Sequence, residues 1–141
     1  MNLRQIRADL ERDEGWRAHA YQDHLGFWTI GYGFLIDERR GGGLPKPIAD
    51  RWLDHILVEI GKALDARIPW WRYQPDNVQR ALVNMAYQLG VSGLLNFRKM
   101  LAALQRGDRL EAAAEALNSR WAAQTPARAR RVAAWIGGDD D

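Results

Sequence analysis

Residues 14–33 read EGWRAHAYQDHLGFWTIGYG, and this stretch decides the fold class. Residues 17–36 are rich in aromatic and β-branched side chains with single glycines between them, a pattern typical of a small β-meander with tight turns. Leu3, Ile6 and Leu10 lie at helical spacing before it, which predicts a short helix over 3–12. Residues 37–47 contain three consecutive glycines and two prolines and are expected to form a loop.

Helical periodicity dominates the rest of the chain. Apolar residues recur every four positions from Ile48 to Leu64, which predicts one long helix over 48–68. Shorter helices are predicted at 76–89, 94–106, 108–118 and 126–136. The predicted fold class is therefore α+β and mainly α. It consists of two lobes: a small N-terminal β-meander, a long interlobe helix and an α-helical C-terminal lobe. Two lobes form a cleft, and clefts bind extended polymers.

The length of 141 residues is that of one domain. We assign residues 1–136 to a single domain. Its β-containing lobe is predicted at about 13–47, the interlobe helix at 48–68 and the helical lobe at 69–136, with the helix 3–12 belonging to the helical lobe. Residues 137–141 read GGDDD and are predicted to be a disordered acidic tail.

The composition limits the chemistry that the chain can perform. It has no cysteine, which excludes disulfides, cysteine zinc sites and thiol nucleophiles. His19 and His24 lack a third partner at any known ligand spacing, so neither a metal site nor a cofactor is expected. Aspartate and glutamate number 18, which favours acid–base chemistry on carboxyl groups.

Charge is distributed unevenly. Residues 67–136 carry 11 Lys/Arg against 4 Asp/Glu, whereas residues 1–66 carry 9 against 11. Such a basic half suits an anionic partner, namely nucleic acid, a lipid surface or bacterial cell wall, although a solvated basic face is the alternative. Residues 118–136 also form a basic amphipathic pattern that would allow weak membrane contact. No apolar run approaches the roughly 18 residues of a membrane-spanning helix, and the start of the chain has no signal-peptide pattern.

Two carboxylates stand out by position. Glu14 ends the predicted first helix and precedes Gly15, and Asp23 lies nine residues later in the first turn of the meander. Glycoside hydrolysis needs one carboxyl group that protonates the leaving oxygen and a second group on the other side of the sugar. The first must keep its proton near neutral pH, which an apolar wall from Trp16 or Tyr21 would favour. On spacing alone, a helix-end glutamate and an unrelated turn aspartate are the favoured interpretation.

Three blocks of the sequence resemble the phage-type lysozymes, the muramidases of glycoside hydrolase family 24. Residues 14–33 match the pattern E-G-x-R, then Y-x-D-x-x-G, then T-I-G-x-G. Residues 84–97, NMAYQLGVSGLLNF, and residues 118–132, NSRWAAQTPARARRV, resemble two further family blocks. The chain departs from the family at Phe34, where histidine is usual, and in the short loop 37–47, which should trim one rim of the cleft.

The resemblance implies a role for each matching residue. Glu14 would be the general acid, Asp23 the carboxylate that assists the attacking water, and Thr29 a residue that holds this water. A wider separation of the two carboxyl groups fits the inverting outcome attributed to the family. Gln88 and Phe97 would bind substrate.

Three further residues would support the site. Arg128 matches an arginine that pairs with the catalytic glutamate, so its charge would favour the ionised form of Glu14 while the apolar wall favours the protonated form. Asp13 and Arg131 would tie the first helix to the last. Trp121 is expected to pack beneath the cleft rather than to stack on a sugar.

The implied function is that of a phage endolysin. It would hydrolyse the β-1,4 bond between N-acetylmuramic acid and N-acetylglucosamine in peptidoglycan, as a monomer without metal, cofactor or nucleic acid. It would accumulate in the host cytoplasm and reach the periplasm and wall through a lesion made by a holin. A catalytically weak peptidoglycan-binding module and a lytic transglycosylase are the alternatives. Intact Glu14, Asp23 and Thr29 argue against the first, and the presence of Asp23 and Thr29 argues against the second, which uses a single glutamate.

Overall fold

The computed structural model describes residues 1–22, 25, 27–31, 34–35 and 43–139. Its contacts divide the chain into two compact units, Met1–Leu53 and Asp54–Asp141, and each is described by itself. The predicted organisation into two lobes stays a prediction. The helix predicted at 3–12 falls in the first unit, so its predicted association with the helical lobe remains a prediction.

The first unit begins with helix α1, Leu3–Glu14. The Asn2 side chain caps its start by accepting a hydrogen bond of 3.1 Å from the backbone N–H of Gln5. At its end, Gly15 has a φ of 75° and its N–H donates to the carbonyl of Glu11 at 2.8 Å. A side chain rarely adopts this backbone conformation, so glycine ends the helix immediately after Glu14.

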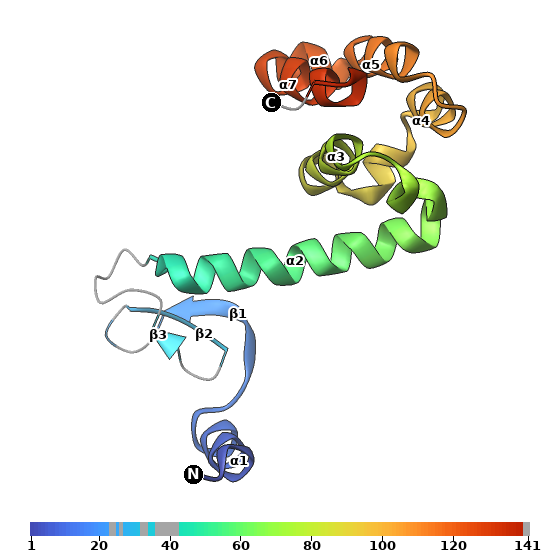
Figure 1. Cartoon of the computed structure of the whole chain (residues 1–141). Helices are drawn as coiled ribbons and strands as arrows, with labels where there is room; N and C mark the ends of the chain where they lie inside the picture. Colours follow the sequence, from blue (N-terminus) through green and yellow to red (C-terminus); the bar gives the residue numbers. More distant parts are fainter. Residues whose placement is uncertain (23–24, 26, 32–33, 36–42, 140–141) are drawn as a thin grey trace. The chain divides into compact units, whose positions relative to one another are not determined.

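A three-stranded antiparallel sheet follows α1, with strand order β1-β2-β3 (Figure 1). The strands are β1, Arg17–Gln22, β2, Trp28–Gly31, and β3, Phe34–Leu35. Thr29 lies on the central strand, opposite Tyr21 on one side and Leu35 on the other. Thr29 is only 6% exposed. The predicted β-meander is confirmed, and it buries Thr29 at its centre.

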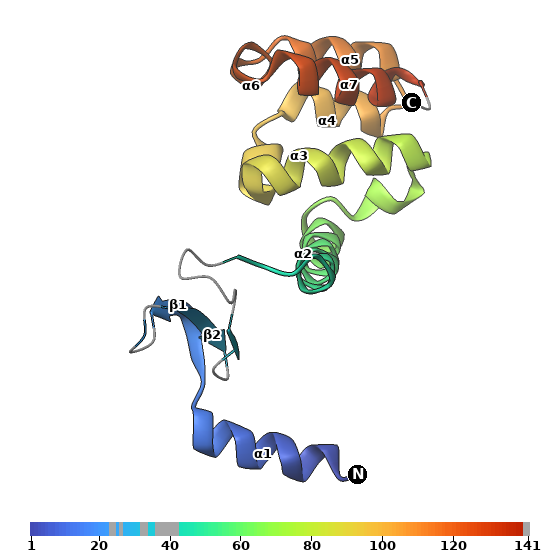
Figure 2. The ribbon, with the colours of Figure 1, turned by 90° about the vertical axis from the view of Figure 1, so that its left-hand side faces the viewer.

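The second unit is helical. Helix α2, Lys46–Arg67, begins in the first unit and ends in the second. A 3-10 helix η1, Pro69–Tyr73, then leads to the remaining helices: α3, Asp76–Leu95; α4, Arg98–Gln105; α5, Arg109–Leu117; α6, Arg120–Gln124; and α7, Pro126–Gly137. Helix α7 lies along α5 and also contacts α3 (Figure 1, Figure 2).

The core of this unit is aliphatic at its centre and aromatic at its margins. Leu64, Leu82 and Leu94 are fully buried, and they bring α2 and α3 into one cluster. Trp71, Trp121 and Trp135 are at least nine-tenths buried in the same cluster. Burial of such large side chains is the main stabilising contribution to folding.

Several predicted boundaries in the helical region are wrong. Helix α3 runs to Leu95, but a non-helical backbone at Gly90 breaks it where the predicted helix 76–89 ends, so that end is confirmed. The next helix begins at Arg98 rather than 94. Helix α6 was not predicted as a separate element. The tail was placed too early, because α7 includes Gly137 and the N–H of Asp139 donates to the carbonyl of Ala134 at 2.9 Å. Residues 140 and 141 lie outside the described residues.

The fold class is confirmed as a lysozyme-like α+β fold, mainly α. Across the described part of the chain, the helices are too short or too polar to cross a membrane.

Candidate active site

Two of the three predicted catalytic residues lie in the described part of the first unit. Glu14 is the last residue of α1, and its side chain is exposed. Thr29 lies on β2, and its hydroxyl donates a hydrogen bond of 3.2 Å to the carbonyl of Phe27. A helix that ends at Glu14 and a sheet that buries Thr29 therefore hold these two residues on regular elements.

Asp23, the third predicted catalytic residue, lies outside the described residues, as does His24. The chain places Asp23 directly after Gln22, the last residue of β1. Its role stays a prediction. Phe34, where the family usually has histidine, belongs to β3.

The two predicted substrate-binding residues meet at one tryptophan of the second unit. The indole Nε1 of Trp121 donates a hydrogen bond of 2.8 Å to Oε1 of Gln88. The ring of Phe97 packs edge-on against the ring of Trp121, with 5.8 Å between centroids and an interplanar angle of 87°. Trp121 itself is only 5% exposed, which confirms that it packs in the core rather than offering a face to a sugar.

Arg128 is fixed by a residue that the sequence analysis did not single out. Its Nε donates to Oδ1 of Asn84 at 2.9 Å, and its Nη2 donates to the backbone carbonyl of Asn84 at 3.3 Å. These contacts hold α7 against α3 through a partly buried guanidinium. Asn84 is the first residue of the block 84–97 that resembles the family. The resemblance was therefore the sequence signal that could have singled out Asn84. The predicted pairing of Arg128 with Glu14 would link a residue of the second unit to one of the first, and it remains a prediction.

The other predicted supporting pair, Asp13 and Arg131, would also link the two units. Asp13 is exposed and accepts a hydrogen bond of 3.3 Å from Nε of its neighbour Arg12. Arg131 is exposed on α7. The predicted tie between Asp13 and Arg131 remains a prediction.

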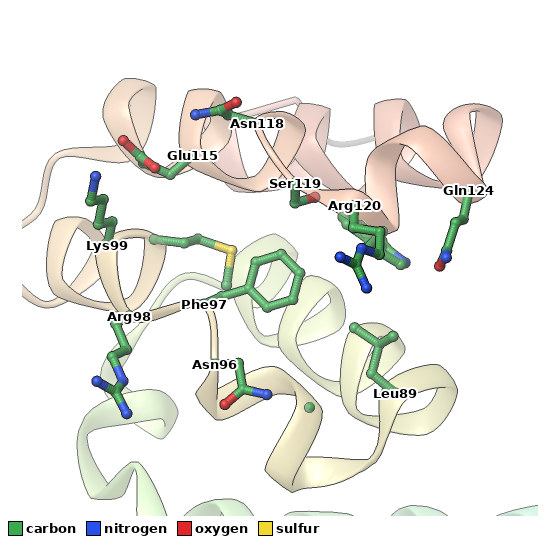
Figure 3. A pocket seen from close by; sticks show the side chains of 13 residues that line it. Leu89, Asn96, Phe97, Arg98, Lys99, Glu115, Asn118, Ser119, Arg120 and Gln124 are labelled. Carbon is green, nitrogen blue, oxygen red and sulfur yellow. The ribbon is translucent and has the colours of Figure 1, made fainter.

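A pocket of about 610 Å³ opens in the second unit, where α3, α4, α5 and α6 meet (Figure 3). Phe97 and Trp121 line it together with Leu89, so part of its wall is apolar. The charged residues Arg98, Lys99, Glu115 and Arg120 also line it. These positions are spread over three helices and follow no common period, so the sequence gives no signal that they share a pocket.

No cluster of three or more histidine, aspartate or glutamate side chains that would hold a metal ion occurs among the described residues.

Comparisons with known proteins show what the chain is similar to. A family model described as phage lysozyme matches residues 11–133. The chain is 30% identical over 155 residues to probable T4-type lysozyme 1 of Dictyostelium discoideum, with 90% of each protein covered. It is 28% identical over 108 residues to an endolysin of Acyrthosiphon pisum secondary endosymbiont phage 1, with 75% of this chain and 70% of the endolysin covered.

A further relative is much longer. The pre-baseplate central spike protein Gp5 of Enterobacteria phage T4 is 30% identical over 148 residues, which cover 87% of this chain and 26% of the spike protein. The chain thus spans about a quarter of that protein. Because the phage lysozyme model covers most of the chain, from the end of α1 to within α7, the chain belongs to the phage lysozyme family.

Proposed function

We propose that this protein is a muramidase that hydrolyses the β-1,4 bond between N-acetylmuramic acid and N-acetylglucosamine in peptidoglycan. The observation that carries the proposal is the family match over residues 11–133, a range within which Glu14, Asp23 and Thr29 fall. Relatives that carry the names lysozyme and endolysin support a glycosidase. Peptidoglycan is the substrate that membership of the family implies.

Glu14 is the general acid in this proposal. Its carboxyl group protonates the glycosidic oxygen as the bond to the anomeric carbon breaks. Gly15 supports this role, because its left-handed backbone ends α1 directly after Glu14 and keeps the side chain at an exposed helix end. Asp23 accepts a proton from the water that attacks the opposite face of the sugar, which gives inversion.

Thr29 supplies an acceptor for this water. Its hydroxyl has one proton, and that proton is directed to the carbonyl of Phe27. A water beside Thr29 therefore donates to the hydroxyl oxygen, since a hydroxyl with its proton in use can only accept. A water that donates one proton to Thr29 and the other to Asp23 turns a lone pair toward the anomeric carbon. Burial of Thr29 fixes the position of this oxygen.

Gln88 binds sugar as a hydrogen-bond donor. Because Trp121 occupies Oε1 of Gln88, the NH₂ end of the same amide is the end that is left for substrate. The carbonyl oxygen of an N-acetyl group is a suitable acceptor. Phe97 contributes apolar contact next to it, packed against the same tryptophan.

The biological role that we propose is lysis of a bacterial host at the end of phage infection. The enzyme would collect in the host cytoplasm as a monomer and act in the periplasm after a holin opens the membrane. The basic half of the chain would add attraction to an anionic wall, and this attraction should weaken as ionic strength rises.

One comparison favours a second candidate role. The T4 spike protein contains a region similar to this chain within a protein named for the baseplate, so the module also occurs as part of a phage particle. A chain with this role would bind or locally open the wall during entry. Lysis from within and wall opening from the particle share the same chemistry and differ in when and where the protein is present.

Identification of the reaction products tests the chemistry. Purified peptidoglycan is digested in H₂¹⁸O and the released fragments are identified by mass. A muramidase produces reducing N-acetylmuramic acid ends that contain one ¹⁸O atom. Anhydro ends without ¹⁸O would show a lytic transglycosylase, and the absence of any cut glycan would leave only a binding module.

A further inference from the structure

Strand β1 contains a bulge that brings two of its residues together (Figure 1). Arg17 lies opposite Gly31 of β2. Four residues further along β1, Tyr21 lies opposite Thr29, which is only two residues from Gly31. Residues four apart in a regular strand are separated by about 13 Å. The bulge shortens this separation, because the extra residues of β1 project out of the ladder between the two pairs.

The guanidinium of Arg17 stacks on the ring of Tyr21. Its Cζ lies 4.1 Å from the ring centroid, which is within the range of a cation–π contact. Residues two apart on a strand share a face of the sheet, and directly paired residues share a face as well. The pairing of β1 with β2 therefore places Arg17, Tyr21 and Thr29 on the same face.

Tyr21 is the neighbour of Thr29 across the ladder. Directly opposed residues of an antiparallel pair have Cβ atoms about 4.5–5.5 Å apart, so their side chains meet. Tyr21 is half-buried, and Thr29 is buried with its hydroxyl directed to the carbonyl of Phe27. The ring of Tyr21 thus forms a wall beside the Thr29 side chain. A displacement of the ring would open the position of the water that Thr29 holds in the proposed reaction.

We propose that Arg17 is a positioning residue of this reaction, because its stacking on Tyr21 holds the ring beside Thr29 and the ring confines the attacking water. The inference rests on the proposed function, since it needs a water at Thr29. Arg17 acts through Tyr21 and touches neither the water nor the reacting atoms. A guanidinium suits this role because its planar surface stacks on a ring while its charge stays hydrated.

Substitution of the two stacked residues tests the coupling between them. Loss of an exposed cation–π contact should lower kcat on peptidoglycan fragments by about twofold to fivefold in R17A, with KM nearly unchanged. Y21L removes the wall itself and should lower kcat further, by up to about 10²-fold. In the Y21L background, R17A should have no further effect on kcat, because its contact is already lost. Additive effects of the two substitutions would overturn the inference.

Three control variants separate this role from others. R17K keeps a cation that can lie over the ring and should recover part of the loss seen in R17A. Y21F keeps the ring and should retain the wild-type kcat, whereas a loss as large as that of Y21L would assign the effect to the phenol and overturn the inference. R7A removes the same charge from an exposed position of α1 and should leave kcat unchanged. Equal losses in R7A and R17A would show a general effect of charge instead.

Competition between water and methanol tests how firmly the water is held. The variants digest peptidoglycan fragments in buffer that contains methanol, and the products are identified by mass. When methanol attacks, its oxygen bonds to the anomeric carbon and its proton passes to Asp23. Glu14 protonates the leaving oxygen as before, so a methyl glycoside replaces the reducing end. We expect the share of methyl glycoside to rise several-fold in R17A and Y21L relative to wild type. A purely structural loss would lower the amount of folded enzyme and leave this share unchanged, which would overturn the inference.

The methyl group of Thr29 gives an answer that does not depend on catalysis. The ring of Tyr21 shifts the NMR signal of this methyl group, and R17A should move the signal part of the way toward its position in Y21L. An unmoved signal in R17A would overturn the inference, and cleavage by wild type would leave the muramidase intact. No cleavage of peptidoglycan by wild type would overturn the proposed function, whereas the methyl signal would still show whether Arg17 holds the ring.

Discussion

Trp121 and Gln88 form a pair in which one residue determines how the other can bind substrate. The indole N–H of Trp121 donates to Oε1 of Gln88 over 2.8 Å, and these residues come from α6 and α3. Trp121 is buried and cannot turn to another partner without leaving its donor unsatisfied. The amide of Gln88 is therefore oriented by the core of the protein, with its NH₂ group left for substrate.

Removing the indole donor should affect both stability and binding. In W121F the ring is kept in part but Oε1 of the partly buried Gln88 loses its hydrogen bond, and such a bond contributes about 1 kcal/mol to stability. We expect the free energy of unfolding in urea to fall by this amount and KM for peptidoglycan fragments to rise. Q88L removes the amide itself, so we expect it to raise KM for the same fragments about as much as W121F does. A W121F enzyme with unchanged KM and unchanged stability would show that the pair has no role.

Asn84 should prove necessary for the placement of Arg128. Its side-chain and backbone oxygens accept two hydrogen bonds from the guanidinium, at 2.9 and 3.3 Å. N84A removes the shorter one, and we expect a loss of about 1 kcal/mol in unfolding free energy. If Arg128 acts on Glu14, misplacing it should also lower kcat, by up to about 10²-fold.

The matched control is N84D, which keeps an oxygen at the same position and can still accept from Arg128. We expect N84D to retain more stability than N84A, while its added negative charge competes for the cation and changes the pH profile of kcat. Identical pH profiles for wild type and N84D would contradict a link between Arg128 and the general acid.

Arg109 should contribute to stability without contributing to catalysis. Its guanidinium donates to Oδ1 of Asn77 at 2.8 Å and to the carbonyls of Trp135 and Ile136, both at 2.9 Å. These carbonyls lie in the last turn of α7, where that of Trp135 also accepts from the N–H of Gly138 at 3.2 Å, so Arg109 adds to the capping of this helix end. R109A should lower the unfolding free energy by about 2–3 kcal/mol, since hydrogen bonds from a charged group are involved. R109K should recover part of this loss. An unchanged urea midpoint for R109A would rule the contribution out.

The corner between α2 and η1 should make stability depend on pH. Arg72 donates to both oxygens of Asp65 and Trp71 donates to Oδ1 at 2.8 Å, and these bonds, that from Arg72 first, lower the pKa of Asp65. Because the pKa of Asp65 is lower in the folded than in the unfolded state, its ionised carboxylate stabilises the fold at pH values above the ordinary aspartate pKa of about 3.9. This contribution is lost as the pH falls through the folded-state value.

The substitution D65N isolates this effect. Wild type should be more stable than D65N at pH 7, and the difference between them should vanish as the pH is lowered below about 4. Urea unfolding at several pH values measures it. A difference that persists at low pH would show that shape, rather than charge, accounts for the effect of the substitution.

The sequence predicts the fold well where one period covers a whole element. The four-residue repeat from Ile48 to Leu64 lies within a single helix, and the aromatic stretch with its glycines forms the expected sheet. A predicted helix boundary is wrong where apolar residues keep helical spacing across the break between two helices. Leu94, Phe97 and Leu101 keep helical spacing although Phe97 is a non-helical cap, so the start of α4 was placed four residues too early.

The site is predictable from sequence only in part. The resemblance to the phage-type lysozymes singled out Thr29 and Gln88, and the structure gives the hydroxyl and the amide specific partners. Asn84 was missed because its role depends on a contact between α3 and α7, 44 residues apart in the sequence. The pocket charges were missed for the same reason, since packing of separate helices brings Lys99 and Arg120 to one pocket.

The central claim is that Glu14 is the general acid of a muramidase. The most direct test is the rate of cleavage of purified peptidoglycan by E14Q relative to wild type, with the folded state checked by circular dichroism. Glutamine keeps the size of the side chain and cannot donate the proton, and general acid catalysis contributes about 10²–10⁴-fold. We expect E14Q to remain folded and to lose cleavage by at least the lower of these factors. A folded E14Q that cleaves peptidoglycan at the wild-type rate would contradict the account.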